Sequence, residues 1–397
     1  MNTPVVTDHG VRRASEARLP WLDHLRIAVT VLVVVHHAAQ PYGPDDWWYV
    51  QSHPRSDALA TLSALDGTFA MSLFFFVSAY FVPSSYQRHG VWAFAKGRLR
   101  RLGIPLVVGA LTIVPGLMYA YYVHYRGYQP ISYAHYFTDV YLGVGDKPDD
   151  WSGPSWPDLQ FAHLWFVQNL LVYSMLYLLC RQAARLLRSG PHTSRPTRVP
   201  GHGALVLLTL ALATATFAVR LRYRLDTWVP FLDFIQVEPA RLPLQAGYFV
   251  LGVLAHRFGW LERFPARSGW IWLVGGLVGA VVLFVVGPHA ACFATGGASW
   301  QSALWALYES GLCVALCTGL LTLFRELRMA PGPVSRELSA GAYTVYIVHL
   351  PIVVAVQFAL VGLPALGAWA ATAVFGTVMA FVAAAMVRRL PGFRSVL

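Results

Sequence analysis

Two polar residues, Arg26 and His37, stand in the first long apolar stretch of the chain, at a spacing that puts them on one face of a helix. Eleven residues turn an α-helix about three times, so both side chains point the same way, about 16 Å apart along the axis. Histidine exchanges a proton near neutral pH, and arginine binds or stabilises an anion. Because charge among apolar residues is costly, the pair predicts a functional site.

The composition predicts that this pair lies inside a membrane. Of the 397 residues, 56% are hydrophobic and 12% are charged, and the mean hydropathy is +0.49. These values are too apolar for a soluble globule and are typical of a polytopic membrane protein. The net charge of +11 would favour a nucleic-acid partner in a soluble protein. Here arginines in cytoplasmic loops can account for it, and we expect no nucleic acid to bind.

Runs of about 17 to 25 largely apolar residues predict an all-α fold with about ten transmembrane helices. They lie near residues 22–40, 66–83, 104–124, 161–180, 203–221, 242–256, 270–288, 302–324, 339–360 and 364–387. If the N-terminus is cytoplasmic, most of the 30 Lys and Arg residues fall in cytoplasmic segments. The positive-inside rule therefore predicts that both termini are cytoplasmic.

The chain is expected to form one membrane domain with short tails. Residues 1–19 lack the apolar core of a signal peptide and predict a flexible cytoplasmic segment. The transmembrane domain is expected over 20–387 and a cytoplasmic tail over 388–397. A further flexible cytoplasmic segment is expected at 189–202, which is rich in Pro, Ser, Gly and Arg. The four cysteines show no metal-site spacing, so we expect packing roles and no metal: Cys180, Cys292, Cys313 and Cys317.

The predicted outer loops are acidic and aromatic. Trp47 and Trp48 lie in the first of them, and the second is rich in similar residues: Asp139, Asp146, Asp149, Asp150, Asp158, Trp151 and Trp156. Such tryptophans can form an aromatic belt at the membrane surface. Beside the carboxylates Asp45, Asp46 and Asp57 they can also bind a sugar, by stacking and by hydrogen bonds to hydroxyl groups. Trp47 and Trp48 are therefore candidate substrate-binding residues, with the belt as the alternative.

A basic cluster follows the second span, in the sequence GVWAFAKGRLRRLGIPL. Arg98, Arg100 and Arg101 stand there on a predicted interfacial helix at the cytoplasmic surface. Such clusters orient membrane proteins and contact lipid headgroups. Arginine is also a natural ligand of phosphate groups, such as the diphosphate of coenzyme A.

Two further polar residues lie within predicted spans. Glu309 is expected to be paired, protonated or in contact with a wet cavity, and pairing with His37 would orient the histidine as a base. His349 can either orient a substrate or bond to a neighbouring helix.

Other polar residues of the spans have weaker claims. His36 competes with His37 for the role of base, but a regular helix turns it about 80° from the Arg26 face. Asp23 and Asp66 stand at predicted span ends, where solvated or capping roles are expected.

Five motifs resemble a known family when they are taken in order. They are the Arg26 to His37 spacing, GTFAMSLFFFVSAYF from Gly67, Arg98-x-x-Arg101 before GIPL, HLWFVQNLLVYS at 163–174, and SAGAYTVYIVHLPI at 339–352. Together they look like the membrane-bound acyltransferase-3 family, whose members O-acylate surface glycans, lipids and secondary metabolites. The resemblance extends from residue 19 to about 387. The FVSAYF, Arg98 to Pro105 and HLWFVQNLL segments look most similar to the glucan-succinylating branch.

The resemblance implies a role for each matching residue. His37 matches the presumed catalytic base, Arg26 its companion, and Arg98 and Arg101 the pair that engages the acyl donor. The expected donor is cytoplasmic acyl-CoA, with acetyl-CoA and succinyl-CoA both possible co-substrates. The expected acceptor is a hydroxyl of a glycan, a lipid-linked sugar or a secondary metabolite, reached across a bacterial inner membrane. Direct attack by the acceptor and an acyl-histidine relay both remain open.

A proton-coupled transporter is the alternative function. Arg26, His37, Glu309 and His349 inside the bilayer could form its pathway. A transporter of this kind should show two similar halves, and the sequence does not reveal them. The transporter hypothesis also gives the basic cluster no role. A membrane scaffold without chemistry would not require polar groups on one helix face.

Overall fold

The structure, a computed structural model, describes residues 19–43, 47–50, 55–153, 155–187, 198–290, 293–294, 296–393 and 396. In this part of the chain the regular structure is almost entirely helical, and nine segments are long and apolar enough to cross a membrane. The predicted all-α polytopic membrane fold is thus confirmed. The expectations for residues 1–18 and 188–197, and for Asp45, Asp46 and Cys292, lie outside the described residues.

The long helices form a central and a peripheral set. The central set consists of α1 (Pro20–Ala39), α2 (Asp57–Tyr80), α9 (Leu242–Phe258), α12 (Trp300–Glu326) and α13 (Pro333–Ala359). The peripheral set consists of α3 (Val82–Arg98), α4 (Ile104–Thr112), α5 (Val114–His124), α7 (Trp165–Leu187), α8 (His202–Arg220), α11 (Ala266–Ala290) and α14 (Ala365–Arg389).

Short elements connect the long helices. They are α6 (Tyr133–His135), α10 (Trp260–Arg263), 3-10 turns at Gln40–Tyr42, Ala162–Leu164 and Pro239–Arg241, and π-turns at Leu99–Gly103 and Tyr136–Tyr141. Between α8 and α9, β1 (Val229–Phe231) and β2 (Ile235–Val237) pair antiparallel with Pro230 opposite Gln236.

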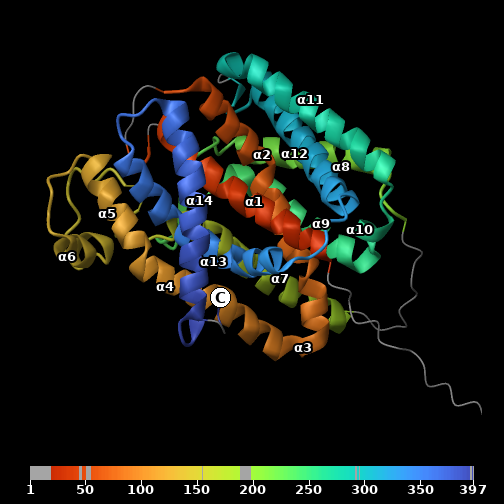
Figure 1. Ribbon diagram of the computed structural model, residues 1–397, viewed down its shortest axis with the longest axis horizontal. Coiled ribbons are helices and arrows are strands. Elements are labelled where there is room, and N and C mark those ends of the chain that lie inside the picture. The colour runs from red at the N-terminus through yellow and green to blue at the C-terminus, as the bar shows by residue number, and fades with distance from the viewer. Residues whose placement is uncertain are drawn as a thin grey trace, which may run out of the picture.

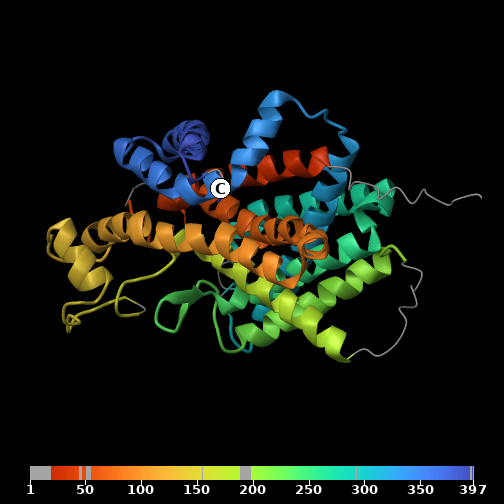
Figure 2. The same ribbon diagram turned by 90° about the horizontal axis from the view of Figure 1, so that it is seen from below.

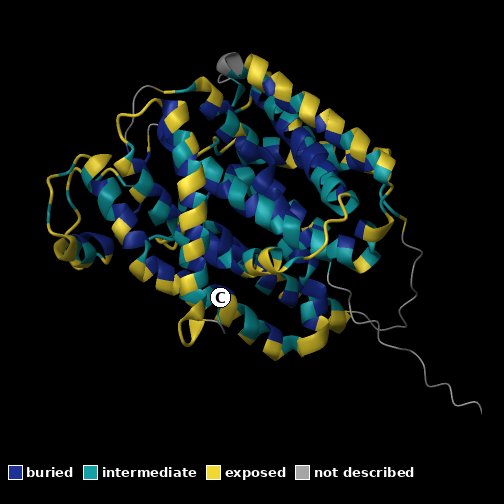
Figure 3. Ribbon diagram, in the orientation of Figure 1, coloured by how far each residue is buried: buried dark blue, intermediate teal, exposed yellow. Residues whose placement is uncertain are grey.

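Figure 1 shows α1 in the middle of the bundle, with α11 and α12 on one side of it and α13 and α14 on the other. From below, α4 and α5 form a nearly continuous rod that leads to α6 and the long loop after it (Figure 2). The outer helices α11 and α14 present exposed apolar faces, whereas α1, α2 and α12 are largely covered (Figure 3). This pattern is expected where lipid surrounds the outer helices.

Nine of the ten predicted spans coincide with the membrane-length segments. The tenth, predicted at 242–256, forms α9, which has 17 residues and is shorter than the other nine. α9 runs beside α2: Arg241 donates to the carbonyl oxygen of Gly67 at 3.1 Å, and the rings of His256 and Tyr80 are 5.2 Å apart. α9 therefore also extends through the bundle.

The second predicted span, 66–83, begins too late. α2 starts at Asp57, because the Ser56 side chain accepts a hydrogen bond from the backbone N–H of Leu59 and caps the helix. The residues that follow favour a helix, although they are less apolar than those after residue 66. Asp66 consequently lies inside α2 and is buried.

Glycines allow neighbouring helices of the bundle to approach one another closely. A Cβ atom on Gly252 of α9 would lie 2.3 Å from the carbonyl oxygen of Phe76 in α2. A Cβ on Gly319 of α12 would lie 2.6 Å from Leu273 in α11. Small residues at such crossings are typical of packed membrane helices.

The two ends of the bundle differ in chemistry. At one end, which we call the basic end, α1 and α13 begin and Arg26, Arg101 and Ser339 lie close together. At the other, which we call the loop end, Trp48, the hairpin and the long loop 125–161 gather. His37 lies toward the loop end of α1, so Arg26 and His37 occupy opposite halves of the bundle.

Candidate functional site

A cavity of about 570 Å³ opens at the loop end, between α1, α2, α9 and α12. This volume is typical of a pocket for a small ligand. The described residues of its wall combine imidazole, carboxylate and indole groups with one guanidinium. They include His36, His37, His163, Asp57, Asp66, Asp226, Glu238, Glu309, Trp47, Trp48, Trp165, Trp228, Trp305 and Arg241.

The ring of His37 is held in one orientation at the cavity wall. Its Nδ1 lies 2.8 Å from the carbonyl oxygen of Val33 and 3.2 Å from Nε2 of His349. The indole of Trp48 stacks on the ring, with centroids 5.9 Å apart and planes inclined by 25°. Trp48 in turn donates from Nε1 to Gln357 at 2.8 Å, and Gln357 donates to the backbone oxygen of His37 at 2.9 Å.

These hydrogen bonds determine which ring nitrogens carry a proton. Carbonyl oxygens only accept, so Nδ1 of His37 donates to Val33, and Nδ1 of His349 donates to Tyr346 at 2.7 Å. Neutral His349 then accepts at Nε2 from Nδ1–H of His37. The lone pair of His37 remains on Nε2, which has no hydrogen-bond partner in the described part of the chain. His37 is therefore arranged to accept a proton from a molecule in the cavity.

His349 lies behind His37, away from the cavity. It is fully buried in α13 and is absent from the cavity wall. Of the two roles left open for it, bonding to a neighbouring helix is the one for which the structure shows a contact, and substrate orientation stays a prediction. Its contact with His37 also joins α13 to α1 at the level of the cavity.

His36 has different partners from His37. Its Nε2 accepts from the side-chain amide of Gln40 at 3.0 Å, and its Nδ1 lies 3.9 Å from Oδ2 of Asp66. Asp66 is only 4% exposed and lines the cavity, so the expectation of a solvated or capping role is wrong. The reason is the earlier start of α2, which moves Asp66 from a helix end to the interior.

His163 is a second site residue that sequence reasoning missed. Its Nε2–H donates to the carbonyl oxygen of Ile347 at 3.0 Å, and its ring lies 5.6 Å from that of His349. Its Nδ1 is buried and has no hydrogen-bond partner among the residues that the structure describes. The motif HLWFVQNLLVYS marked this segment, but nothing in the sequence places it beside α13.

Glu309 pairs with arginines and not with His37. One carboxylate oxygen accepts from Arg220, and the other accepts from Nη1 of Arg241 at 3.3 Å. Glu309 is 1% exposed, and the Arg220 side chain is equally buried. The predicted dyad of Glu309 and His37 is absent from the described contacts, although both residues line the same cavity.

Arg241 is surrounded by carboxylates. Its Nε donates to Glu238 at 2.9 Å, and its Nη2 lies 3.7 Å from Asp226. Burial lowers the pKa of Arg241, but Glu238 and Glu309 outweigh this and raise it overall. Burial raises the pKa of Glu238, although Arg241 opposes that shift. Arg241 and Glu238 lie around a short 3-10 turn, and no sequence motif singled them out.

Arg26 belongs to the basic end and does not line the cavity. Its Nη1 donates to Oδ1 of Asp23 and to Oγ of Ser339, both at 3.3 Å. Four residues further along α13, the hydroxyl of Tyr343 donates to the backbone oxygen of Arg101 at 2.8 Å. One face of α13 therefore connects Arg26 to the basic cluster.

The basic cluster itself lies at the end of α3, with Arg98, and on the π-turn that follows, with Arg100 and Arg101. Arg98 stacks over Phe94, with its guanidinium 5.1 Å from the ring centroid, and Arg100 and Arg101 are exposed. None of these arginines lines the cavity. The sequence predicts Arg26 as the catalytic companion of His37. The structure instead places Arg26 with the basic cluster at one end of the bundle, whereas His37 lies toward the other end.

The predicted first outer loop contributes Trp47 and Trp48 to the cavity wall. Trp48 is 4% exposed and supports His37, whereas Trp47 is 37% exposed, with its ring 5.9 Å from that of Trp48. Trp47 is therefore the more accessible stacking surface. Trp165 and Trp228, whose rings are 6.3 Å apart, contribute another aromatic corner.

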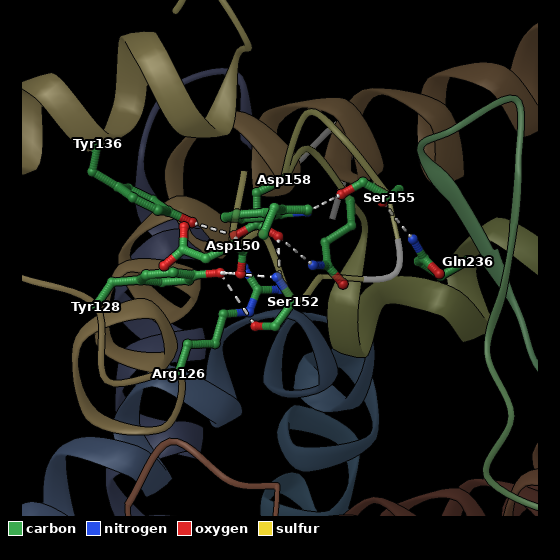
Figure 4. Close-up of polar contacts among 10 residues, drawn as sticks. Arg126, Tyr128, Tyr136, Asp150, Ser152, Ser155, Asp158 and Gln236 are labelled. Carbon is green, nitrogen blue, oxygen red and sulfur yellow. Dashed lines mark hydrogen bonds and ion pairs between the residues drawn. The ribbon is translucent and has the colours of Figure 1, made fainter. Parts of the chain in front are cut away.

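The predicted second outer loop is held by its own buried network (Figure 4). Arg126 donates to both oxygens of Asp158 at 3.2 Å, and Tyr136 donates to the same carboxylate at 2.7 Å. The guanidinium of Arg126 also lies 4.3 Å from the ring centroid of Trp151. Burial raises the pKa of Asp158, while Arg126 opposes the shift. Asp158 and Trp151 therefore hold this loop together. Because their side chains are engaged in this way, the candidate ligand-binding surface is the cavity and not this loop.

The same loop is tied to the hairpin beside the cavity. Gln236 of β2 donates to Oγ of Ser155 at 3.2 Å, as Figure 4 shows. Gln168 of α7 donates to the backbone oxygen of Gln236 at 3.4 Å. These bonds connect loop, hairpin and helix at the loop end.

Comparisons with known proteins agree with the motifs. A family model described as an acyltransferase domain, acyltransferase family 3, matches residues 19–389. Glucans biosynthesis protein C from Escherichia coli O81 (strain ED1a) is 24% identical over 355 residues, which cover 84% of this chain and 81% of that protein. The proteins of the same name from the E. coli strains SMS-3-5 and K12 match over the same extent and with the same identity. No solved structure matches the chain significantly.

Proposed function

Because the chain belongs to the acyltransferase-3 family, whose members are membrane-bound O-acyltransferases, we propose that it moves an acyl group from acyl-CoA to a hydroxyl group of a glucan. The donor binds at the basic end, on the cytoplasmic side of a bacterial inner membrane. The acceptor enters the cavity at the loop end. The observation that carries this proposal is the unpartnered Nε2 of His37 at the wall of a cavity lined by tryptophans and carboxylates.

His37 acts as the general base in this proposal. Nε2 takes the proton of the acceptor hydroxyl while the hydroxyl oxygen attacks the thioester carbonyl. The carbon–sulfur bond breaks, and the thiolate of coenzyme A leaves and is protonated. As His37 becomes cationic, His349 accepts the hydrogen bond from its Nδ1 and keeps the ring in place.

The basic end is suited to the donor. Arg98, Arg100 and Arg101 supply guanidinium groups for the phosphates of coenzyme A. From that end, α13 presents Ser339, Tyr343 and Tyr346 at helical spacing toward the cavity, where Tyr346 forms part of the wall. We propose that the pantetheine arm follows this face of α13 toward His37.

The acceptor proposal comes from the cavity and from the relatives. Indole rings stack on the apolar faces of sugar rings, and carboxylates accept hydrogen bonds from their hydroxyl groups. Trp47, Trp228 and Asp226 supply such groups near the mouth of the cavity. The relatives are named for glucan biosynthesis, and a glucan is therefore the first acceptor to test.

Replacing Arg98 and Arg101 separately by alanine is expected to raise the KM for acyl-CoA about tenfold, because each loses a charge-assisted bond to phosphate. The turnover at saturating donor should stay near that of the wild type. Steady-state kinetics with varied acyl-CoA measures both quantities. Arg388→Ala, which removes an arginine from the end of α14, is the control. An unchanged KM in both Arg98→Ala and Arg101→Ala would contradict donor binding by the cluster. The arginines would then serve only to orient the protein in the membrane.

Replacing His349 by phenylalanine is expected to lower the turnover by about 10- to 100-fold, since His37 keeps its lone pair but loses the acceptor behind it. The KM for acyl-CoA should change little. A shift of the pH profile of turnover should accompany the loss, because the partner of the titrating base has changed. A turnover and a pH profile like those of the wild type would show that His349 only packs.

The function itself is tested with purified protein in detergent, acyl-CoA carrying a radiolabelled acyl group, and glucan oligosaccharides. We expect labelled oligosaccharide that loses its label under mild alkaline hydrolysis, as an ester does. Thioester that is neither cleaved nor transferred, in protein shown to be folded, would contradict the proposal. Proton-coupled transport, the alternative considered from sequence, has no support from the family match or from the relatives.

A further inference from the structure

The charges around the cavity favour an uncharged acyl group. We propose that the enzyme transfers a neutral acyl group such as acetyl and discriminates against a dicarboxylic one such as succinyl. This inference rests on the proposed function and narrows its donor. It concerns the part of the donor that must enter the cavity to reach His37, and not the phosphates, which stay at the basic end.

Carboxyl groups dominate the titratable side chains of the cavity. Among the described residues of its wall there are five of them, Asp57, Asp66, Asp226, Glu238 and Glu309, against the single guanidinium of Arg241. Asp66, Glu238 and Glu309 are at most 8% exposed. Water therefore screens charge poorly there, and a further carboxylate buried beside them without a cation of its own is strongly unfavourable.

Arg241 is already engaged by the protein. Its Nε donates to Glu238 at 2.9 Å, and its Nη1 donates to Gly67 at 3.1 Å and to Glu309 at 3.3 Å. Nη2 lies 3.7 Å from Asp226. A substrate carboxylate would have to displace one of these partners, and a buried carboxylate left without its arginine is strongly unfavourable.

The histidines do not supply a cation either. Nδ1 of His37 is turned away to Val33 and His349, and its Nε2 must stay unprotonated to act as a base. His36 lies beside Asp66, with 3.9 Å between Nδ1 and Oδ2. His163 is buried, and its one N–H already donates to Ile347.

The remaining arginines near the site are also unsuited to the acyl group. Arg220 is bound to Glu309 and does not line the cavity. Arg26 is at the basic end, on the opposite half of α1. In the described part of the chain the cavity wall thus offers no unoccupied cation to a succinyl carboxylate. An acetyl group needs no such partner.

The inference is tested on the wild-type protein with three donors: acetyl-CoA, succinyl-CoA and succinamoyl-CoA. The last replaces the succinyl carboxylate by an amide of nearly the same size. We expect kcat/KM for acetyl-CoA and for succinamoyl-CoA to exceed that for succinyl-CoA by about tenfold or more, because only succinyl-CoA brings a charge that the cavity leaves without a cation. Succinyl-CoA used as well as acetyl-CoA would overturn the inference and leave the proposed function standing.

The amide donor separates charge from size. If succinamoyl-CoA is rejected as strongly as succinyl-CoA, size is the cause and the charge argument fails. If none of the three thioesters supplies its acyl group to a glucan oligosaccharide, the proposed function fails and the inference fails with it.

A pair of variants tests the source of the discrimination. Glu238→Gln removes a buried carboxylate from the cavity wall and leaves Nε of Arg241 without that partner, so it should raise the ratio of succinyl to acetyl transfer several-fold. Glu337→Gln makes the same chemical change at an exposed pair with Arg388 and should leave the ratio unchanged. The ratio is measured within one sample of each variant, so partial loss of folded protein does not affect it. An equal ratio in Glu238→Gln and the wild type would contradict the role of cavity charge.

Discussion

Replacing His37 by alanine is expected to lower the turnover of acyl transfer by about 10²- to 10⁴-fold, the range that a positioned general base contributes. The lone pair on Nε2 is the group lost, because Nδ1 is already committed to Val33 and His349. Binding of acyl-CoA should persist, since the basic cluster is intact. Single-turnover transfer of radiolabelled acyl groups measures the first quantity, and equilibrium dialysis of acyl-CoA measures the second.

Variants of the neighbouring residue His36 test whether His37 itself is the base. His36→Ala should retain much more activity than His37→Ala, and His89→Ala, which changes an exposed histidine of α3, should behave as the wild type. The opposite order, with His36 essential and His37 dispensable, would transfer the role of base to His36 and its neighbour Asp66.

Replacing Glu309 by alanine is expected to lower the free energy of unfolding by about 3 to 5 kcal/mol, because it leaves Arg220 buried without its carboxylate partner. Arg241 would lose one of its partners as well but would keep Glu238. Denaturant unfolding in detergent micelles, followed by tryptophan fluorescence, measures the change.

A second ion pair serves as the control for Glu309. Glu337→Ala removes an exposed partner of Arg388 and should change stability by no more than about 1 kcal/mol. If Glu309→Ala keeps the stability of the wild type and loses only acyl transfer, Glu309 acts in the chemistry and the structural interpretation of its ion pairs is wrong.

The fold was largely predictable because the membrane imposes its pattern on the sequence. Apolar runs of membrane length located nine spans and the position of α9. The error at α2 arose because residues 57–65 form a helix without being apolar enough to mark a span. Because of that error Asp66 was not predicted as a site residue, since a carboxylate at a helix end is expected to be solvated or to cap the helix.

The site was predictable only along single helices. Helical spacing placed Arg26 and His37 on one face of α1, and the apolar context singled out Glu309 and His349. Contacts between residues of different helices depend on how the helices pack, and this packing cannot be predicted from the pattern of a single sequence. Hence the partner of His37 is His349 of α13, and the partners of Glu309 are Arg220 and Arg241.

Transfer across a sealed membrane tests the central claim most directly. The protein is reconstituted into proteoliposomes that enclose glucan oligosaccharides, and radiolabelled acetyl-CoA is added outside, with the basic end of a defined fraction of molecules facing outward. We predict labelled oligosaccharide inside the vesicles, lost in His37→Ala and formed without entry of acetyl-CoA. Label that appears only when donor and acceptor share one compartment would contradict a donor site at the basic end and an acceptor site at the loop end.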